Sequence, residues 1–165
     1  MRTRLLLLVL ALLAIGAPVP ALASPATTTA RWTAPVAAPL EVTRPFEPPS
    51  GPYAAGHRGV DLGGVAGSVV LAAADGVVVF AGMVAGRPVV SIDHSVGLRT
   101  TYEPVEPSVV AGQPVVRGFP IGTLAEGHDG CPRAACLHWG VRRGESYLDP
   151  MLLLHPVQVR LLPWD

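Results

Sequence analysis

Short apolar runs separated by glycine, proline or aspartate turns are the feature that most constrains this chain. The runs are rich in Val, Ile, Leu and Thr, and they include SVVLAA, GVVVFAG, RPVVSIDH, LRTTYEPV, PVVRGFPIGTL and CLHWGVRR. The chain holds 18 glycines and 18 prolines, which supply the turns. Outside the first segment no sustained stretch shows the 3.6-residue period of a helix. This pattern predicts an all-β fold, a sandwich or barrel of short strands.

The first segment has the three-part layout of a secretory signal peptide. Two arginines, at positions 2 and 4, precede the apolar run Leu5–Ile15, and the triplet 21–23 (Ala-Leu-Ala) offers a small-residue cleavage site. The apolar run is too short to span a bilayer, which needs about 20 residues. We expect residues 1–23 to be removed and the product to be secreted; the alternative is a buried N-terminal helix. No other run is apolar enough to predict a transmembrane helix.

The rest of the chain is predicted to form one domain with flanking segments. Residues 24–40 are rich in Pro, Ala and Thr without a sustained period, so we expect a flexible leader. We expect the domain at 41–155, with one helical turn in LDPMLLLHP, and a tail at 156–165 that can add a last strand. The chain has no lysine, and its formal net charge of zero falls to about −2 without the first two arginines. With no basic patch, nothing indicates a nucleic-acid partner.

Two segments carry residues that suit a metal. GHRGVDL places His57 and Asp61 four residues apart, and zinc accepts imidazole nitrogen and carboxylate oxygen at about 2 Å. Alone, this spacing fits a surface histidine beside a solvated aspartate equally well. CLHWG adds His138, which in a strand shares a face with residue 136 and not with Leu137 or Trp139. Two histidines and one carboxylate would leave the open fourth position of a catalytic zinc site; the alternative for His138 is a buried core histidine.

The other histidines and the cysteines allow simpler interpretations. His94 lies at the rim of the expected hairpin VVSIDHSVGLRTTYEP, where its hydrogen bonds can hold the turn. His128 lies in the loop EGHDGCP and faces either a cleft or solvent, and His155 receives no role. Cys131 and Cys136 form a close pair, which in an exported chain predicts a disulfide. The alternative is a pair of thiolate metal ligands.

From about residue 42 to residue 154, these segments together resemble one family. GHRGVDL, GSVVLAAADGVVVFAG, VVSIDHSVGLRTTYEPV, VVAGQPVVRGFPIGTL and CLHWGVRRGESYLDPMLLL resemble, in order, the motifs of the lysostaphin/LytM-type zinc metallopeptidases, which cleave peptide bonds in bacterial peptidoglycan. The resemblance implies the antiparallel β fold called the duplicated hybrid motif. It also implies Zn²⁺ as cofactor, with His57, Asp61 and His138 as its ligands.

The chain departs from the family at two catalytic positions. Where the family's H-x-H motif has its first histidine, this chain has Cys136. Where the family's Y-x-H motif has its histidine, this chain has Pro104. A disulfide-bonded cysteine is no base, and proline has no donor. General acid–base help contributes about 10²–10⁴-fold and one oxyanion donor about 10²–10³-fold, so this loss predicts a weak enzyme unless another group substitutes.

Three nearby residues are candidate substitutes. His128 is the preferred one, because a Cys131–Cys136 bridge would tether its loop beside the strand that holds the ligand at 138. Tyr102 is a second candidate. Glu103 ranks lower, because it should point to the opposite strand face from Tyr102.

Two functions remain open at this stage. One is a zinc-dependent endopeptidase that acts, outside the cytoplasm at the cell wall, on stem or cross-bridge peptides of peptidoglycan. The other is a catalytically degenerate module that binds the wall or activates a separate cell-wall hydrolase, as degenerate relatives in this family do. The intact ligand set favours the first, and the changed residues at 104 and 136 favour the second. A sugar-phosphotransferase domain shares the fold, but export argues against it because its phosphoryl donors are cytoplasmic.

Overall fold

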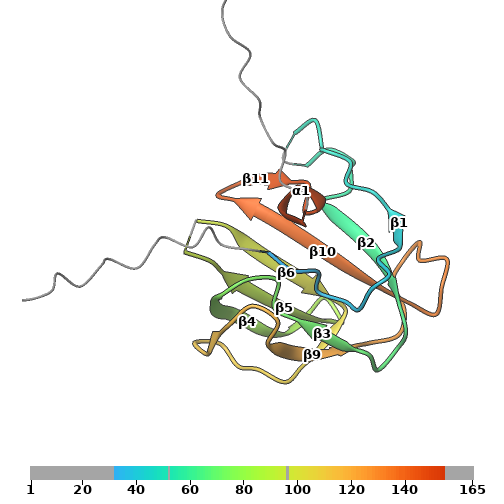
Figure 1. The fold of residues 1–165 in the computed structure, drawn as a ribbon. Coiled ribbons are helices and arrows are strands. Elements are labelled where there is room, and N and C mark those ends of the chain that lie inside the picture. The colour runs from blue at the N-terminus through green and yellow to red at the C-terminus, as the bar shows by residue number, and fades with distance from the viewer. Residues whose placement is uncertain (1–31, 52, 96, 155–165) are drawn as a thin grey trace, which may run out of the picture.

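A computed structural model describes residues 32–51, 53–95 and 97–154. They form an almost entirely β structure (Figure 1). Its elements are β1 (Val42–Arg44), β2 (Gly59–Gly64), β3 (Val69–Leu71), β4 (Gly76–Val84), β5 (Arg87–Asp93), β6 (Arg99–Glu103), β7 (Val105–Pro107), β8 (Pro114–Val115), β9 (Pro120–Leu124), β10 (Ala135–Arg143), β11 (Ser146–Leu148) and α1 (Met151–Leu154). Among them, no helix is long and apolar enough to cross a membrane.

Two antiparallel sheets enclose one core. The larger sheet has the order β1-β2-β10-β6-β5-β4-β8, with β11 paired to β10, and the smaller has the order β3-β9-β7. Buried side chains of both sheets belong to one cluster, in which Trp139 and Tyr102 are the largest fully buried residues. The predicted all-β, antiparallel fold is therefore confirmed, as are the β5–β6 hairpin and the helical turn before residue 155.

Strand alternation separates the core from the opposite face of the large sheet. On β10, Leu137, Trp139 and Val141 are buried in the core. His138, Gly140 and Arg142 occupy the alternate positions and lie on the other face, because successive residues alternate in a strand. The same alternation on β6 buries Tyr102 and presents Glu103 on the face that carries His138. This second face of the large sheet carries the candidate site.

His94 holds the hairpin end of the large sheet. Its Nδ1 donates to the carbonyl of Asp75 at 2.8 Å, and its Nε2 lies 2.8 Å from the Thr100 hydroxyl. Burial lowers the pKa of His94, so the ring stays neutral and can accept at Nε2. The edge of Trp32 packs against this ring, with centroids 4.8 Å apart. The hydrogen-bonding interpretation of His94 is confirmed.

The segment 32–40 differs from the flexible leader that the composition predicted. Thr33 donates its backbone N–H to the Ala73 carbonyl, and the Leu71 N–H donates to the Pro35 carbonyl, each at 2.9 Å. Val36 is 8% exposed and belongs to the core cluster. The prediction was wrong here because backbone pairing beside β3 and one buried valine were invisible in a Pro- and Ala-rich composition. Residues 24–31, the signal peptide, His155 and the tail lie outside the described residues.

The packing of residues 32–40 against the core can be tested by introducing one charged side chain. Val36→Asp places a carboxylate among core residues, so we expect it to lower the free energy of unfolding by at least ~3 kcal/mol. Ala37→Asp is the matched control, because Ala37 is exposed, and we expect a change within about 0.5 kcal/mol. Urea unfolding measures both. Equal stabilities of the two variants would show that the segment does not pack on the core.

Candidate metal centre

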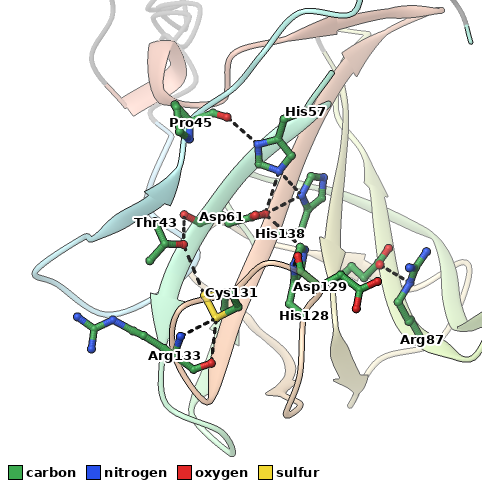
Figure 2. A network of polar contacts seen from close by, with 12 residues as sticks. Thr43, Pro45, His57, Asp61, Arg87, His128, Asp129, Cys131, Arg133 and His138 are labelled. Atoms are coloured by element: carbon green, nitrogen blue, oxygen red, sulfur yellow. Dashed lines mark hydrogen bonds and ion pairs between the residues drawn. A yellow bond between two sulfur atoms is a disulfide. The ribbon is translucent and has the colours of Figure 1, made fainter. Parts of the chain in front are cut away.

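The pairing of β2 with β10 brings two of the predicted ligands together. In this antiparallel ladder Asp61 is the direct partner of His138, between the pairs Val60–Trp139 and Leu62–Leu137. The neighbouring pairs are buried in the core, so the aspartate and the histidine share the opposite face. Asp61 is 1% exposed, and the side chain of His138 is 20% exposed. The site therefore has a buried carboxylate beside a partly exposed imidazole, and Figure 2 shows the two side chains in contact.

His57 reaches the site from the loop that precedes β2. Its backbone forms an isolated bridge with Glu47, with both N–H···O distances near 3 Å (3.0 and 2.8 Å). Its Nδ1 lies 2.6 Å from the Pro45 carbonyl. A carbonyl only accepts, so Nδ1 carries a proton, and Nε2 faces Asp61. A backbone partner of this kind is typical of histidines that bind metals.

Three atoms with lone pairs converge in this site. The Asp61 Oδ1 atom lies 3.0 Å from His57 Nε2 and 2.9 Å from His138 Nδ1, and the two nitrogens are 3.0 Å apart. A carboxylate oxygen and an unprotonated nitrogen both accept, so this arrangement needs a shared proton or a cation between them. The second carboxylate oxygen, Oδ2, is buried and has no hydrogen-bond partner among the described residues. The donor set and this orphaned oxygen fit a metal ion such as Zn²⁺.

The electrostatics of the site keep the aspartate charged. Burial raises the pKa of the Asp61 carboxyl, but the hydrogen bond from His138 and the nearby charge of His128 outweigh burial. The pKa therefore lies below its usual value, and the carboxylate is ionised at neutral pH. A buried negative charge beside two imidazoles is compensated best by a bound cation.

His128 also lies at this site. Its Nε2 is 3.4 Å from Asp61 Oδ1, and its ring stacks on that of His138 with centroids 5.7 Å apart (Figure 2). The Cys131–Cys136 disulfide joins the loop to β10, and the Cys131 N–H donates to the His128 carbonyl at 2.9 Å. The predicted disulfide is thus present, and the loop histidine lies beside the predicted ligands.

The structure reverses the predicted order of Tyr102 and Glu103 as candidate substitutes for the missing histidines. Tyr102 is fully buried, its pKa is raised to about 12 by burial, and its hydroxyl accepts from the Ala73 N–H in the core. Glu103 does point away from Tyr102, but this is the face of His138, whose direct cross-strand partner it is. Its carboxylate is 20% exposed and lies 2.6 Å from Arg87 Nε. The prediction that Glu103 is the poorer candidate was therefore wrong, because the face of β6 that meets the site depends on the register of β6 with β10.

The two positions where the family keeps histidines are closed to solvent. Cys136 is 0% exposed, and its sulfur, besides the disulfide, contacts the Thr43 hydroxyl at 3.5 Å. Pro104 is buried as well. The third imidazole near the site, besides those of His57 and His138, therefore comes from the loop at His128 and not from these two positions.

His138 lines a groove on the same face of the large sheet. A cavity of about 240 Å³ is lined by His138 and Glu103, then by Gly140 and Thr101, then by Arg142 and Arg99, with Arg58 and Tyr147 also in the lining. The site thus has access from one side, across the surface formed by β6 and β10.

Comparisons with known proteins agree with this geometry. The model described as "Peptidase family M23" matches residues 55–150. The uncharacterized protein Rv2891 of Mycobacterium tuberculosis is 51% identical over 133 residues, covering 78% of this chain and 53% of that protein. The chain spans about half the length of the curated relatives it matches.

Solved structures agree as well. Helicobacter pylori Csd3 superposes with a TM-score of 0.64 at 26% identity, over 80% of this chain and 37% of that one. The catalytic domain of the antimicrobial peptidase lysostaphin from Staphylococcus simulans gives a TM-score of 0.59 at 24% identity, over 70% of this chain and 92% of that one. The lysostaphin likeness supports the predicted fold, and the family match supports the predicted resemblance.

The close approach of β2 to β10 at Gly59 can be tested directly. A Cβ at Gly59 would lie 2.5 Å from the Trp139 carbonyl oxygen and 2.7 Å from His138 Nε2. We expect Gly59→Ala to destabilise the fold by ~1–3 kcal/mol, because strand or imidazole must move, and to weaken zinc binding. Urea unfolding and zinc titration measure these effects. Gly51→Ala is the control, since its Cβ would meet nothing within 4 Å; indistinguishable behaviour of the two variants would contradict the described strand pairing.

Proposed function

The chain belongs to peptidase family M23, and on this premise we propose that it is a zinc-dependent endopeptidase that hydrolyses peptides of the bacterial cell wall. The observation that carries the proposal is the set of three ligand atoms from His57, Asp61 and His138, all within 4.8 Å of one another. The family supports a peptidase of the peptidoglycan-hydrolase type. The ligand geometry supports zinc as the metal.

The proposed ligands are His57 Nε2, Asp61 Oδ1 and His138 Nδ1. When bound, zinc supplies a Lewis acid that activates water and polarises a peptide carbonyl. The protein contributes fixed orientation: the Pro45 carbonyl holds the His57 ring, and the β2–β10 ladder holds the other two side chains. Three protein ligands leave one position for water or substrate, the arrangement of catalytic rather than structural zinc sites.

His128 is the proposed proton carrier. Its Nδ1 lies 2.9 Å from the Asp129 carbonyl and therefore donates there, and its Nε2 lies on the side of Asp61 (Figure 2). This nitrogen can take a proton from the attacking water and return it to the leaving amine. The side chain is 15% exposed, so substrate has access to it.

The second candidate function is a non-catalytic module that binds the wall or activates a separate hydrolase. The observation that favours it is the absence of imidazole at Cys136 and Pro104, both of which are buried. Without these groups the tetrahedral oxyanion lacks donors that are worth about 10²–10³-fold each. Such a module could still bind zinc, so zinc binding alone does not distinguish the two functions.

We propose that the protein acts outside the cytoplasm. The signal-peptide pattern of residues 1–23 supports export, with cleavage after Ala23. The Cys131–Cys136 disulfide supports the same location, because such bonds persist in oxidising compartments. Peptides of the cell wall would then be accessible to it.

Zinc dependence and catalysis are tested together with one variant. We expect the protein to bind one zinc ion and to release new amino groups from purified peptidoglycan, and His138→Ala to lose both. Zinc content and amine release are the measurements, and His94→Gln, away from the ligands, serves as the control that retains zinc. Bound zinc with no amine release would support the non-catalytic module, whereas no zinc binding would contradict both the ligand set and the peptidase.

The proton role of His128 gives a separate prediction. We expect His128→Ala to lower kcat by about 10²–10⁴-fold, because the general acid–base contribution is lost, while zinc affinity changes little. Asp129→Asn is the matched control: it lies on the same loop and keeps the backbone carbonyl that orients the ring. Undiminished hydrolysis by the alanine variant would exclude the role.

A further inference from the structure

The loop between β9 and β10 carries His128 and is fastened to β10 by a covalent bond. His128 and Cys131 are the first and last residues of one turn, in which the Cys131 N–H donates to the His128 carbonyl at 2.9 Å. The disulfide to Cys136 fixes the end of this turn on β10 (Figure 2). His128 Nε2 lies 3.4 Å from Asp61 Oδ1, longer than a good hydrogen bond, so the imidazole depends on the turn for its position.

The two ends of the disulfide lie in different surroundings. Cys136 is 0% exposed and is the direct partner of Gly63 in the β2–β10 ladder. Cys131 is partly exposed, and residues 132–134, which follow it, are exposed. The loop end of the bridge is therefore the end that a dissolved thiol can reach. The Arg133 N–H donates to the Cys131 sulfur at 3.4 Å, and a hydrogen bond of this kind stabilises a thiolate there once the bridge is reduced.

Besides the bridge, the described contacts that hold this loop to the rest of the protein are weak. Arg133 pairs with Glu41, but both side chains are half exposed, and exposed ion pairs contribute little. The Gly127 N–H donates to the Ala134 carbonyl at 3.2 Å, which closes the neck of the loop without reaching the turn that begins at residue 128. Gly127 and Gly130 have φ of 77° and 81°. Because glycine loses the most conformational freedom when it is ordered, conformational entropy favours release of an untethered loop.

The metal ligands are positioned independently of the disulfide. The β2–β10 ladder places Asp61 opposite His138, and the pairing of β10 with β6 holds the same strand from its other side. His57 is oriented by the Pro45 carbonyl. Loss of the bridge would therefore displace the loop histidine and leave the three ligand side chains in place.

We propose that the Cys131–Cys136 bond is a redox-controlled tether. The oxidised protein holds His128 at the metal centre, and reduction by a dithiol releases the loop and removes the imidazole from it. This regulation rests on the proposed function, because it takes His128 as the proton carrier of the peptidase. It lowers turnover without removing a zinc ligand.

The reduction is a thiol–disulfide exchange. One thiolate of the dithiol attacks the Cys131 sulfur, the S–S bond breaks, and Cys136 leaves as a thiolate that takes up a proton. The second thiol of the dithiol then attacks the mixed disulfide, so that Cys131 becomes a thiol and the dithiol becomes a cyclic disulfide. Two electrons and two protons pass from the dithiol to the two cysteines.

Hydrogen exchange tests the release of the loop without turnover. The zinc-loaded protein is measured oxidised, and again after reduction by dithiothreitol and its removal without air, with the zinc content determined both times. We expect the hydrogen-bonded amides of Gly127 and Cys131 to exchange at least ~10-fold faster in the reduced protein, and the amides of the β2–β10 ladder to be unchanged. Cys131→Ser should show the faster exchange at residue 127 with and without the reductant.

Amine release from peptidoglycan tests whether the effect acts through His128. We expect reduction to lower the rate toward that of His128→Ala, by up to about 10²–10⁴-fold, at unchanged zinc content. In His128→Ala itself, reduction should change the rate little, because the displaced group is already absent. Arg133→Gln is the matched control: it removes the ion pair with Glu41 and keeps the bridge, and we expect the oxidised variant to hydrolyse like the wild-type protein.

The two levels of inference fail separately. Unchanged exchange at residues 127 and 131 after reduction would overturn the tether, whatever the activity. An equal loss of rate in His128→Ala would overturn the regulation, because reduction would then act elsewhere. If neither redox form hydrolyses peptidoglycan, the peptidase is wrong, and faster exchange of the reduced loop would still support the tether.

Discussion

The register of β2 against β10 is the constraint on which the rest of the structure depends. It places Val60 and Leu62 opposite Trp139 and Leu137 in the core, and by the same step it places Asp61 opposite His138 on the other face. A slip by one residue would expose the core face and bury the ligand face. Fold stability and assembly of the metal centre therefore have the same origin.

The site brings Asp61 Oδ1 and two imidazole nitrogens within 3.0 Å of one another, and we propose that a cation compensates them. The resemblance implies an imidazole at position 136, and we propose that the loop residue His128, whose Nε2 lies 3.4 Å from Asp61 Oδ1, takes its place. Cys136 contributes to that replacement: its bridge to Cys131 anchors the loop that carries His128 beside Asp61. Cys136 thus occupies the position of one family histidine and, through its disulfide, anchors the loop that holds His128 near Asp61.

Much of the fold and of the candidate site could be predicted, because the alternation of side chains along a strand is a local property of the sequence. The alternation around residues 136–139 assigned the core and the ligand face, and the short apolar runs assigned the fold class. The position of Glu103 was not predictable from β6 alone, since its face has meaning only once the register with β10 is known. The packing of residues 32–40 was missed for a related reason: it depends on hydrogen bonds to Leu71 and Ala73, which composition does not encode.

The central claim is that a zinc ion lies among His57, Asp61 and His138, and a crystal structure of the protein grown with zinc would test it most directly. Diffraction at the zinc absorption edge locates the ion independently of any activity. The account predicts one anomalous peak about 2.0–2.2 Å from His57 Nε2, Asp61 Oδ1 and His138 Nδ1. A structure in which these side chains contact each other directly, with no peak between them in the presence of zinc, would contradict it.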